Sequence, residues 1–245
     1  MFRISIYGIV LEYILNLKKN KKFKTFGKLY AIMFDIKGKT KMDALTFKDK
    51  DKYLDSGILT EPFMNIDELN KLLKAEEQKR INSNKEPDII KSLMDLVHYN
   101  ITYSKEKNIQ DQKFKRTAKE IWESKFTSGC TDTAIVFATL ARQLKIPTTI
   151  LHTAQQEWVN KLKTGQDSFH HYGHSFCECF YQNKWILVDP TAGMITEDYN
   201  SEKIVLNYKL GISNTFLPYF RGLDIGRKMT AREHNALMDE KCFNL

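Results

Sequence analysis

Three segments between residues 66 and 125 carry apolar residues at the spacing of an amphipathic helix. The first helix is expected from about Ile66, where Asn65 can cap its N-terminus and Glu68 lies three residues beyond the cap. Pro87 suits the first turn of the second helix, and a third helix is expected over residues 115–125. The apolar positions that define these helices are Leu69, Leu72 and Leu73, then Ile89, Ile90, Leu93, Leu96 and Val97, then Ala118, Ile121 and Trp122.

A fourth helix is apolar on nearly every side and follows the turn Thr127-Ser128-Gly129. Ser128 can cap this helix, Cys130 falls in its first turn, and Asp132 complements the positive end of the helix dipole. The apolar pattern continues to Leu144. A helix without a polar face must be covered all round, so we expect it at the centre of the molecule.

The second half of the chain changes to the pattern of strands. Residues 148–151 are mostly β-branched and predict a strand, whereas the polar residues 155–171 are expected to form a loop. Two further strands, Gly173–Tyr181 and Trp185–Asp189, flank Gln182-Asn183 and predict a β-hairpin with a two-residue turn.

The register of this hairpin decides which side chains share a face. A two-residue turn pairs Tyr181 with Lys184, so that Phe176 lies opposite Asp189. His174 is then a diagonal neighbour of Asp189, at about 7–8 Å between backbones and within reach of both side chains. A slip of one residue would put the two side chains on opposite faces of the sheet.

Cys130, His174 and Asp189 together provide the parts of a thiol catalytic triad. The thiolate is the nucleophilic form of cysteine, and both a helix N-terminus and an imidazolium favour it. The imidazole can carry the proton while a carboxylate holds the ring in the required tautomer. A lone buried cysteine is more often a small apolar side chain, but Cys130 follows a glycine at a helix start and has these two partners.

Composition excludes several classes of protein. The chain has 245 residues, 42% of them apolar and 12% aromatic, which supports a buried core and argues against intrinsic disorder. Its four cysteines are too few for a disulfide-rich secreted scaffold. The apolar stretch Ile4–Leu17 is shorter than the ~20 residues of a membrane span, and lysines follow it where a signal peptide would carry them in front. We therefore expect a cytoplasmic protein with reduced thiols and no membrane span.

The net charge of +8 is concentrated at one end of the chain. Residues 1–30 contain seven basic residues and one acidic residue, which leaves a net charge of +2 for the rest. A nucleic-acid-binding domain spreads its basic residues over a folded face, with aromatic residues among them. No specific nucleic-acid partner is therefore expected, and residues 1–30 favour at most a weak contact with anionic surfaces.

Several spaced motifs follow one another along the second half of the chain. The motifs are Gly129-Cys130-Thr131-Asp132-Thr133-Ala134, Leu140-Ala141-Arg142 followed by Lys145-Ile146-Pro147, Gly173-His174-Ser175-Phe176 with Glu178, and Lys184-Trp185-Ile186-Leu187-Val188-Asp189-Pro190-Thr191. In this order they resemble the transglutaminase-like superfamily. Two departures from the family pattern are visible: Lys145 stands where glycine is usual, and Ser175-Phe176 replace a small residue and tryptophan after the histidine.

The resemblance implies an α+β fold with a papain-like or transglutaminase-like core. In that core the catalytic cysteine begins a buried helix packed on an antiparallel β-sheet, with additional helices at the N- and C-terminal ends. The motifs span about residues 86–193, and the domain is expected to cover residues 61–245. It includes a helix over 231–240 that the capping-box spacing of Thr230 and Glu233 predicts. Residues 1–60 are then a basic extension packed on or flanking the domain.

The resemblance also implies that Cys130, His174 and Asp189 catalyse acyl transfer from a peptide or carboxamide bond through a thioester. The expected partner is a protein or peptide substrate. Hydrolysis, as in a protease or amidase, is favoured because water is always present and excluding it takes a specialised site. A true amine-accepting transglutaminase and a non-catalytic binding module on the same fold remain the alternatives.

The donors that stabilise the oxyanion are less well defined by the sequence. The backbone N–H of Cys130, at a helix N-terminus, is one candidate. The side chains of Trp122, Gln155 and Gln156 are others, although an aromatic residue such as Trp122 more often anchors its helix to the core.

No cofactor and no metal ion are expected. Cys177 and Cys179 lie near His170 and His171, which suggests a zinc site at first sight. Structural zinc sites usually separate two cysteine ligands by two to four residues, whereas here a single residue of a strand separates them. Core packing on the face opposite His174 is the favoured interpretation for both cysteines.

Overall fold

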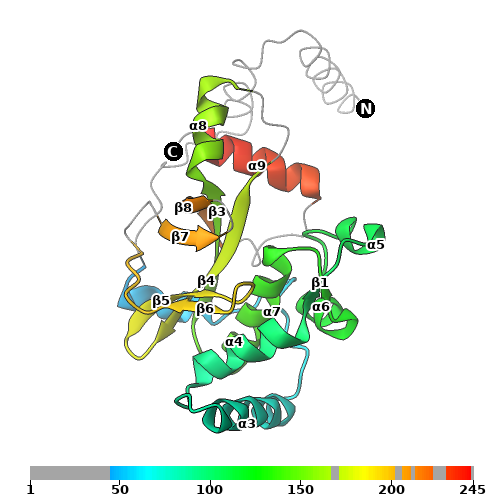
Figure 1. Cartoon of the computed structure of the whole chain (residues 1–245), viewed down its shortest axis with the longest axis vertical. Coiled ribbons are helices and arrows are strands. Elements are labelled where there is room, and N and C mark those ends of the chain that lie inside the picture. Colours follow the sequence, from blue (N-terminus) through cyan, green and yellow to red (C-terminus); the bar gives the residue numbers. More distant parts are fainter. Residues whose placement is uncertain (1–44, 167–170, 202–205, 211–212, 223–229, 244–245) are drawn as a thin grey trace, which may run out of the picture.

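The computed structural model describes residues 45–166, 171–201, 206–210, 213–222 and 230–243 (Figure 1). The basic cluster of residues 1–30 lies outside these ranges, so its contact with anionic surfaces stays a prediction. The helices are η1 (Phe47–Tyr53, a 3-10 helix), α3 (Ile66–Asn82), α4 (Ile89–Asn100), α5 (Lys107–Gln110), α6 (Ala118–Ser124), α7 (Cys130–Gln143), α8 (Gln156–Thr164) and α9 (Ala231–Phe243). The strands are β1 (Thr102–Tyr103), β2 (Phe126–Thr127), β3 (Thr148–Gln155), β4 (Gly173–Tyr181), β5 (Lys184–Asp189), β6 (Met194–Thr196), β7 (Leu206–Leu210) and β8 (Ser213–Arg221).

A sheet of six strands in the order β6-β5-β4-β3-β8-β7 forms the centre of the molecule, and each neighbouring pair in it is antiparallel. The short strands β1 and β2 form a separate parallel pair. This combination of helices with an antiparallel sheet confirms the expected α+β class. Within the described ranges, no helix combines the length and the hydrophobicity that a membrane span requires.

Helix α7 is the central helix, as its apolar pattern predicts. It packs between α4 and the strands β3 and β4, and α3 lies beyond α4 (Figure 1). Phe137 and Leu140 on α7 are fully buried and belong to the core that these elements share. Truncating a buried leucine of this kind to alanine typically costs about 2–5 kcal/mol, so α7 is fixed firmly against the sheet.

The β4–β5 hairpin has the predicted register. Tyr181 pairs with Lys184 and Cys177 pairs with Val188, and both turn residues have positive φ, as a two-residue hairpin turn requires. The sulfur of Cys177 lies 3.5 Å from the carbonyl of Ala134 on α7. Cys177 and Cys179 are both buried in the core beneath α7, in agreement with a packing role.

Three local expectations are corrected by the structure. Helix α4 begins at Ile89, because Asp88 caps it by accepting a hydrogen bond from the Lys91 N–H, and Pro87 therefore precedes the helix. Helix α6 begins at Ala118 rather than at residue 115, because Thr117 is its N-cap.

The third correction concerns residues 155–171, where a loop was the expectation and Gln156–Thr164 forms α8. Trp158 and Val159 are buried and Leu162 is partly buried, which is the apolar stripe of an amphipathic helix. Gly165, with φ of 71°, ends α8 in the left-handed conformation. The stripe is narrow because most of the other side chains of this helix are charged or polar.

Candidate active site

Cys130 is the first residue of α7 and is half-buried. The backbone N–H of Ser175 on β4 hydrogen-bonds its sulfur. The pairing of β5 with β4 extends only to Val188 and Cys177, so the first residues of β4, Ser175 among them, are not paired with β5. This arrangement presents the thiol at the end of the hairpin that carries His174.

His174 and Asp189 form a hydrogen-bonded pair, with 2.7 Å between Nε2 of the ring and Oδ2 of the carboxylate. Both side chains are almost completely buried. The other carboxylate oxygen, Oδ1, accepts hydrogen bonds from the backbone N–H groups of Thr191 and Ala192, each at 2.9 Å. These bonds fix the carboxylate, and the carboxylate in turn fixes the ring, so that Nδ1 of His174 is the ring nitrogen left to face the thiol.

The electrostatics of the site favour a charged pair. Burial raises the pKa of the Cys130 thiol. The facing His174, together with hydrogen bonds from His174 and Ser175, lowers this pKa by more than burial raises it, so the net pKa lies below the ordinary value of 9. Burial lowers the pKa of His174, yet the Cys130 thiolate and Asp189 raise it to about 10. The two shifts therefore favour the thiolate–imidazolium form of the pair over the neutral form.

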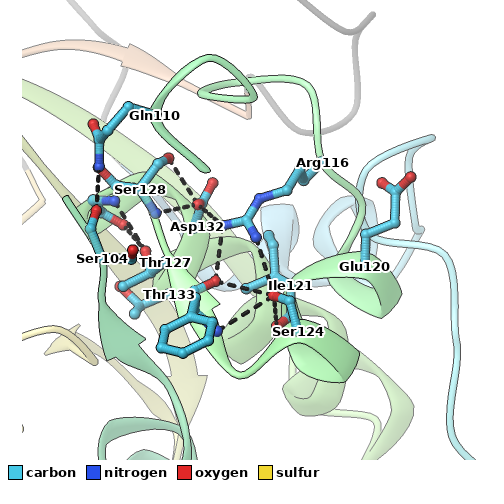
Figure 2. A network of polar contacts seen from close by, with 12 residues as sticks. Ser104, Gln110, Arg116, Glu120, Ile121, Ser124, Thr127, Ser128, Asp132 and Thr133 are labelled. Atoms are coloured by element: carbon cyan, nitrogen blue, oxygen red, sulfur yellow. Dashed lines mark hydrogen bonds and ion pairs between the residues drawn. The ribbon is translucent and has the colours of Figure 1, made fainter. Parts of the chain in front are cut away.

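A polar network holds the turn that precedes Cys130 (Figure 2). Asp132 accepts hydrogen bonds from the backbone N–H of Ser128 at 2.7 Å and from its hydroxyl at 2.8 Å. Arg116 donates to the same carboxylate oxygen at 2.5 Å and to the carbonyl of Phe126 at 2.8 Å. The expectation that the Ser128 side chain caps the helix is therefore wrong: Gly129 is the N-cap, and the hydroxyl of Ser128 donates back to Asp132.

The buried ion pair between Arg116 and Asp132 was not predictable from spacing, because Arg116 precedes the helix by fourteen residues and reaches it only through the fold. Both side chains are almost completely buried. Removing one partner of such a pair typically costs about 3–5 kcal/mol, because the remaining charge is left buried. The network thus fixes the position of the N-terminus of α7, and with it the position of Cys130.

The candidate oxyanion donors differ in their surroundings. Trp122 is partly buried, its ring packs against Phe63, and the Lys125 ammonium lies 4.0 Å from the ring centre. Gln155 ends β3 as the N-cap of α8, and Gln156 is exposed at the start of that helix. These contacts agree with an anchoring role for Trp122.

The hydroxyl of Ser175 is a feature of the site that the sequence did not single out. It lies 2.9 Å from the Thr131 hydroxyl and 3.2 Å from Nδ1 of His152, and it also hydrogen-bonds Cys130. The departure of Ser175 from the family pattern is the signal that could have drawn attention to it. Its partners come from α7 and β3, so their convergence depends on the packing of distant segments.

One comparison with known proteins finds a family match. Residues 74–190 match the model of the transglutaminase-like superfamily. No curated protein matches the chain by sequence.

Two solved structures are similar to the chain at low identity. A candidate cysteine protease from Cytophaga hutchinsonii is 14% identical, with a TM-score of 0.39 over 76% of this chain and 59% of that one. A structure described as a TGase is 18% identical, with a TM-score of 0.34 over 74% of this chain and 40% of that one. The chain thus spans less than two thirds of the length of either protein.

The matched segment begins within α3 and ends just after β5. It contains the central helix α7, the hairpin and the three residues Cys130, His174 and Asp189. Residues 74–190, just under half of the chain, are therefore similar to the transglutaminase-like superfamily.

Proposed function

We propose that the protein is a cysteine enzyme that cleaves a peptide or carboxamide bond through a thioester on Cys130. The observation that carries the proposal is the buried hydrogen bond between His174 and Asp189 beside a thiol of lowered pKa. A nucleophile, a proton carrier and a group that orients the carrier are the three parts that acyl transfer requires. The protein or peptide nature of the substrate rests on the family alone.

In the acylation step, the Cys130 thiolate attacks the carbonyl carbon and a C–S bond forms. The carbonyl oxygen becomes an oxyanion, for which the backbone N–H of Cys130 at the α7 N-terminus is the proposed donor. The imidazolium of His174 then gives its proton to the departing nitrogen as the C–N bond breaks, which leaves a thioester and a neutral imidazole. Asp189 keeps the ring oriented throughout and stabilises its charged form.

In the second step, the neutral His174 takes a proton from water as its oxygen attacks the thioester carbon. The C–S bond breaks, and the products are a carboxylic acid and the regenerated thiolate–imidazolium pair. An amine in place of water would give a new amide, which is the transglutaminase outcome. Hydrolysis is the proposed default, since water needs no binding site.

The experiment that tests this function uses glutamine-containing peptides and peptide amides, with and without hydroxylamine. A thioester on Cys130 reacts with hydroxylamine to give a hydroxamate, while hydrolysis gives an acid and transfer to an added amine gives an amide. Mass spectrometry separates these products, and Cys130→Ala is the control. Absence of any product and of any hydroxamate across the peptide set would favour a binding module over an enzyme.

We also infer that residues 61–245 form one domain and that the segment before it packs on that domain. In the described part of this segment, the carbonyl of Thr46 accepts a hydrogen bond from Trp185 at 3.1 Å. Arg142, buried on α7, donates to the carbonyl of Tyr53 at 3.2 Å and to the hydroxyl of Thr60 at 2.9 Å. These contacts support a flanking position for residues 45–60.

A further inference from the structure

A second polar cluster lies beside Cys130. Ser175, a residue that is 2% exposed, is at its centre: the Oγ atom lies 2.9 Å from Oγ1 of Thr131 and 3.2 Å from Nδ1 of His152. His152 pairs with Ser175 across β3 and β4, so the sheet register places the two side chains next to each other. The Ser175 hydroxyl also hydrogen-bonds the sulfur of Cys130.

The positions of the hydrogens in this cluster follow from the donors and acceptors that its members offer. Ser175 has one hydrogen to donate and three neighbours: Thr131, His152 and the sulfur. Within the described residues, Nε2 of His152 is buried and has no hydrogen-bond partner. If Ser175 donated to Nδ1 of His152, the hydrogen of the ring would sit on Nε2 as a buried donor without an acceptor, which is the costlier defect.

The arrangement that avoids this defect puts the hydrogen of His152 on Nδ1. His152 and Thr131 then both donate to Ser175, whose own hydrogen is left for the Cys130 sulfur. Every hydrogen of the cluster has an acceptor in this arrangement, and only a nitrogen lone pair remains unmatched. The direction of the Ser175 hydroxyl therefore follows from its neighbours.

The surroundings of His152 keep this ring neutral, which the assignment requires. Burial and the nearby His234 on α9 hold the pKa of His152 well below its ordinary range. The ring of His234 stacks on Phe114 at 3.8 Å between centroids, and the hydroxyl oxygen of Tyr219 on β8 lies 3.4 Å from Nε2 of His234. Burial and the charge of Lys113 lower the pKa of His234 to about 4, so neither ring is charged at neutral pH.

We propose that the Ser175 hydroxyl, directed by His152 and Thr131, donates a hydrogen bond to the Cys130 sulfur and stabilises the thiolate. Ser175 then touches the reacting atom, while His152 is a positioning residue that acts through it. The inference deepens the proposed function, because it assigns a thiolate-stabilising group to the same nucleophile. Among the described residues, the titratable groups that act on Cys130 are His174 on β4 and Tyr219 on β8, and the ring of Tyr219 lies 6.3 Å from the ring of His152 between centroids.

The test is the pH dependence of Cys130 alkylation by iodoacetamide, a neutral probe, in the folded full-length chain. Ser175→Ala should raise the midpoint of the acid limb by about 1 pH unit, because the thiolate loses a hydrogen bond that water replaces only in part. Ser175→Thr keeps the hydroxyl and should restore most of the lower midpoint. Peptide mapping assigns the adduct to Cys130.

A second pair of variants tests the directing role of His152. His152→Leu removes the Nδ1 hydrogen and should raise the midpoint less than Ser175→Ala does. His152→Asn places an amide N–H near the position of Nδ1 and should bring the midpoint back toward the wild-type value. This pair keeps the proposal falsifiable if the serine variants fold poorly.

Ser92→Ala is the matched control, because the Ser92 hydroxyl is also fully buried but has no hydrogen-bond partner among the described residues. It should leave the midpoint unchanged. The proposal is overturned if Ser175→Ala, or His152→Leu where Ser175→Ala does not fold, leaves the midpoint at the wild-type value. Alkylation needs no substrate, so this result does not depend on whether the protein hydrolyses peptides. A protein that shows the expected midpoints but no turnover would contradict the proposed function and leave the role of Ser175 standing.

Discussion

Two buried carboxylates lie on the same face of the β4–β5 hairpin, and their partners differ in kind. Asp189 bonds His174 through one oxygen at 2.7 Å. Glu178 on β4 accepts two hydrogen bonds from Arg221 on β8, at 2.6 and 2.8 Å, and a third from the hydroxyl of Tyr199. Glu178 and Asp189 share a face because Glu178 pairs with Leu187 and Asp189 is two residues beyond Leu187 on the same strand.

The difference shows that the partner, and not the buried carboxylate, decides what such a pair can do. A guanidinium keeps its charge at every accessible pH, so the Glu178–Arg221 pair can only join β4 to β8. An imidazole exchanges its proton within the working range of an enzyme, so the His174–Asp189 pair can take part in proton transfer. Changes at the first pair should therefore alter stability, and changes at the second should alter chemistry.

The largest expected effect is at Cys130 and His174. Cys130→Ala should lower turnover of a responsive peptide about 10⁴-fold or more, because no other group can form the thioester, and His174→Ala should be nearly as severe. The double variant should lose little more than Cys130→Ala alone, because the two residues act as one unit. Circular dichroism checks that each variant is folded; wild-type turnover in folded Cys130→Ala would discard this site as an enzyme site.

Asp189→Asn should have the next largest effect on turnover. The amide keeps the shape of the carboxylate but can hold the ring in the wrong tautomer, which costs about 10⁴-fold in the serine-protease example and less, about 10²–10³-fold, for a thiolate that is already charged. The loss should appear in kcat, with the thermal midpoint changed little. A loss confined to stability would place Asp189 with Glu178 as a structural carboxylate.

Glu178→Ala should act in the opposite way. Loss of the carboxylate leaves the buried Arg221 guanidinium without this partner and should lower the free energy of unfolding by about 3–5 kcal/mol. Denaturant titration measures this loss, and kcat of the fraction that stays folded should remain within a few-fold of wild type. A fall in kcat as large as that of Asp189→Asn would remove the distinction between the two pairs.

The pH profile of kcat/KM should report both partners of the charged pair. Activity should rise with pH as Cys130 loses its proton, at a pH below the ordinary thiol value of 9, and should fall again as His174 loses its proton near pH 10. The alkaline fall follows because a neutral imidazole cannot protonate the departing nitrogen. A profile that only begins to rise near pH 9 would contradict the proposed ion pair.

The smallest effect is expected at Lys145, which belongs to neither carboxylate pair. A variant at this position serves as a reference for changes in stability alone. Lys145 has φ of 61° and occupies the position after the end of α7 where glycine is favoured, with its N–H bonded to the carbonyl of Arg142. Lys145→Gly should raise the free energy of unfolding by about 1 kcal/mol, since glycine adopts this conformation without a steric penalty. Thermal melting measures the gain, and turnover should not change.

Much of the site could be predicted from the sequence because it depends on local pattern. The apolar pattern of α7 placed Cys130 at a helix start, and the two-residue turn at Gln182-Asn183 set the register that brings Asp189 beside His174. Both inferences use distances along one helix or one hairpin.

What the sequence did not predict depends on segments that meet only in the folded chain. The Arg116–Asp132 pair and the contact between His152 and Ser175 join distant segments, and no periodicity marks them. Helix α8 was missed for a different reason, because its apolar stripe rests on Trp158, Val159 and Leu162 within a polar segment.

The most direct test of the account compares all four cysteines in one alkylation experiment on the folded protein. Burial raises the pKa of Cys179 to about 12 and also raises that of Cys242, whereas the pKa of Cys130 is lowered. Site-resolved mass spectrometry at neutral pH should therefore find Cys130 alkylated at least about tenfold faster than Cys177, Cys179 or Cys242, and His174→Ala should remove most of that advantage. Equal rates at the four cysteines, or a Cys130 rate that does not respond to His174→Ala, would contradict the thiolate–imidazolium pair.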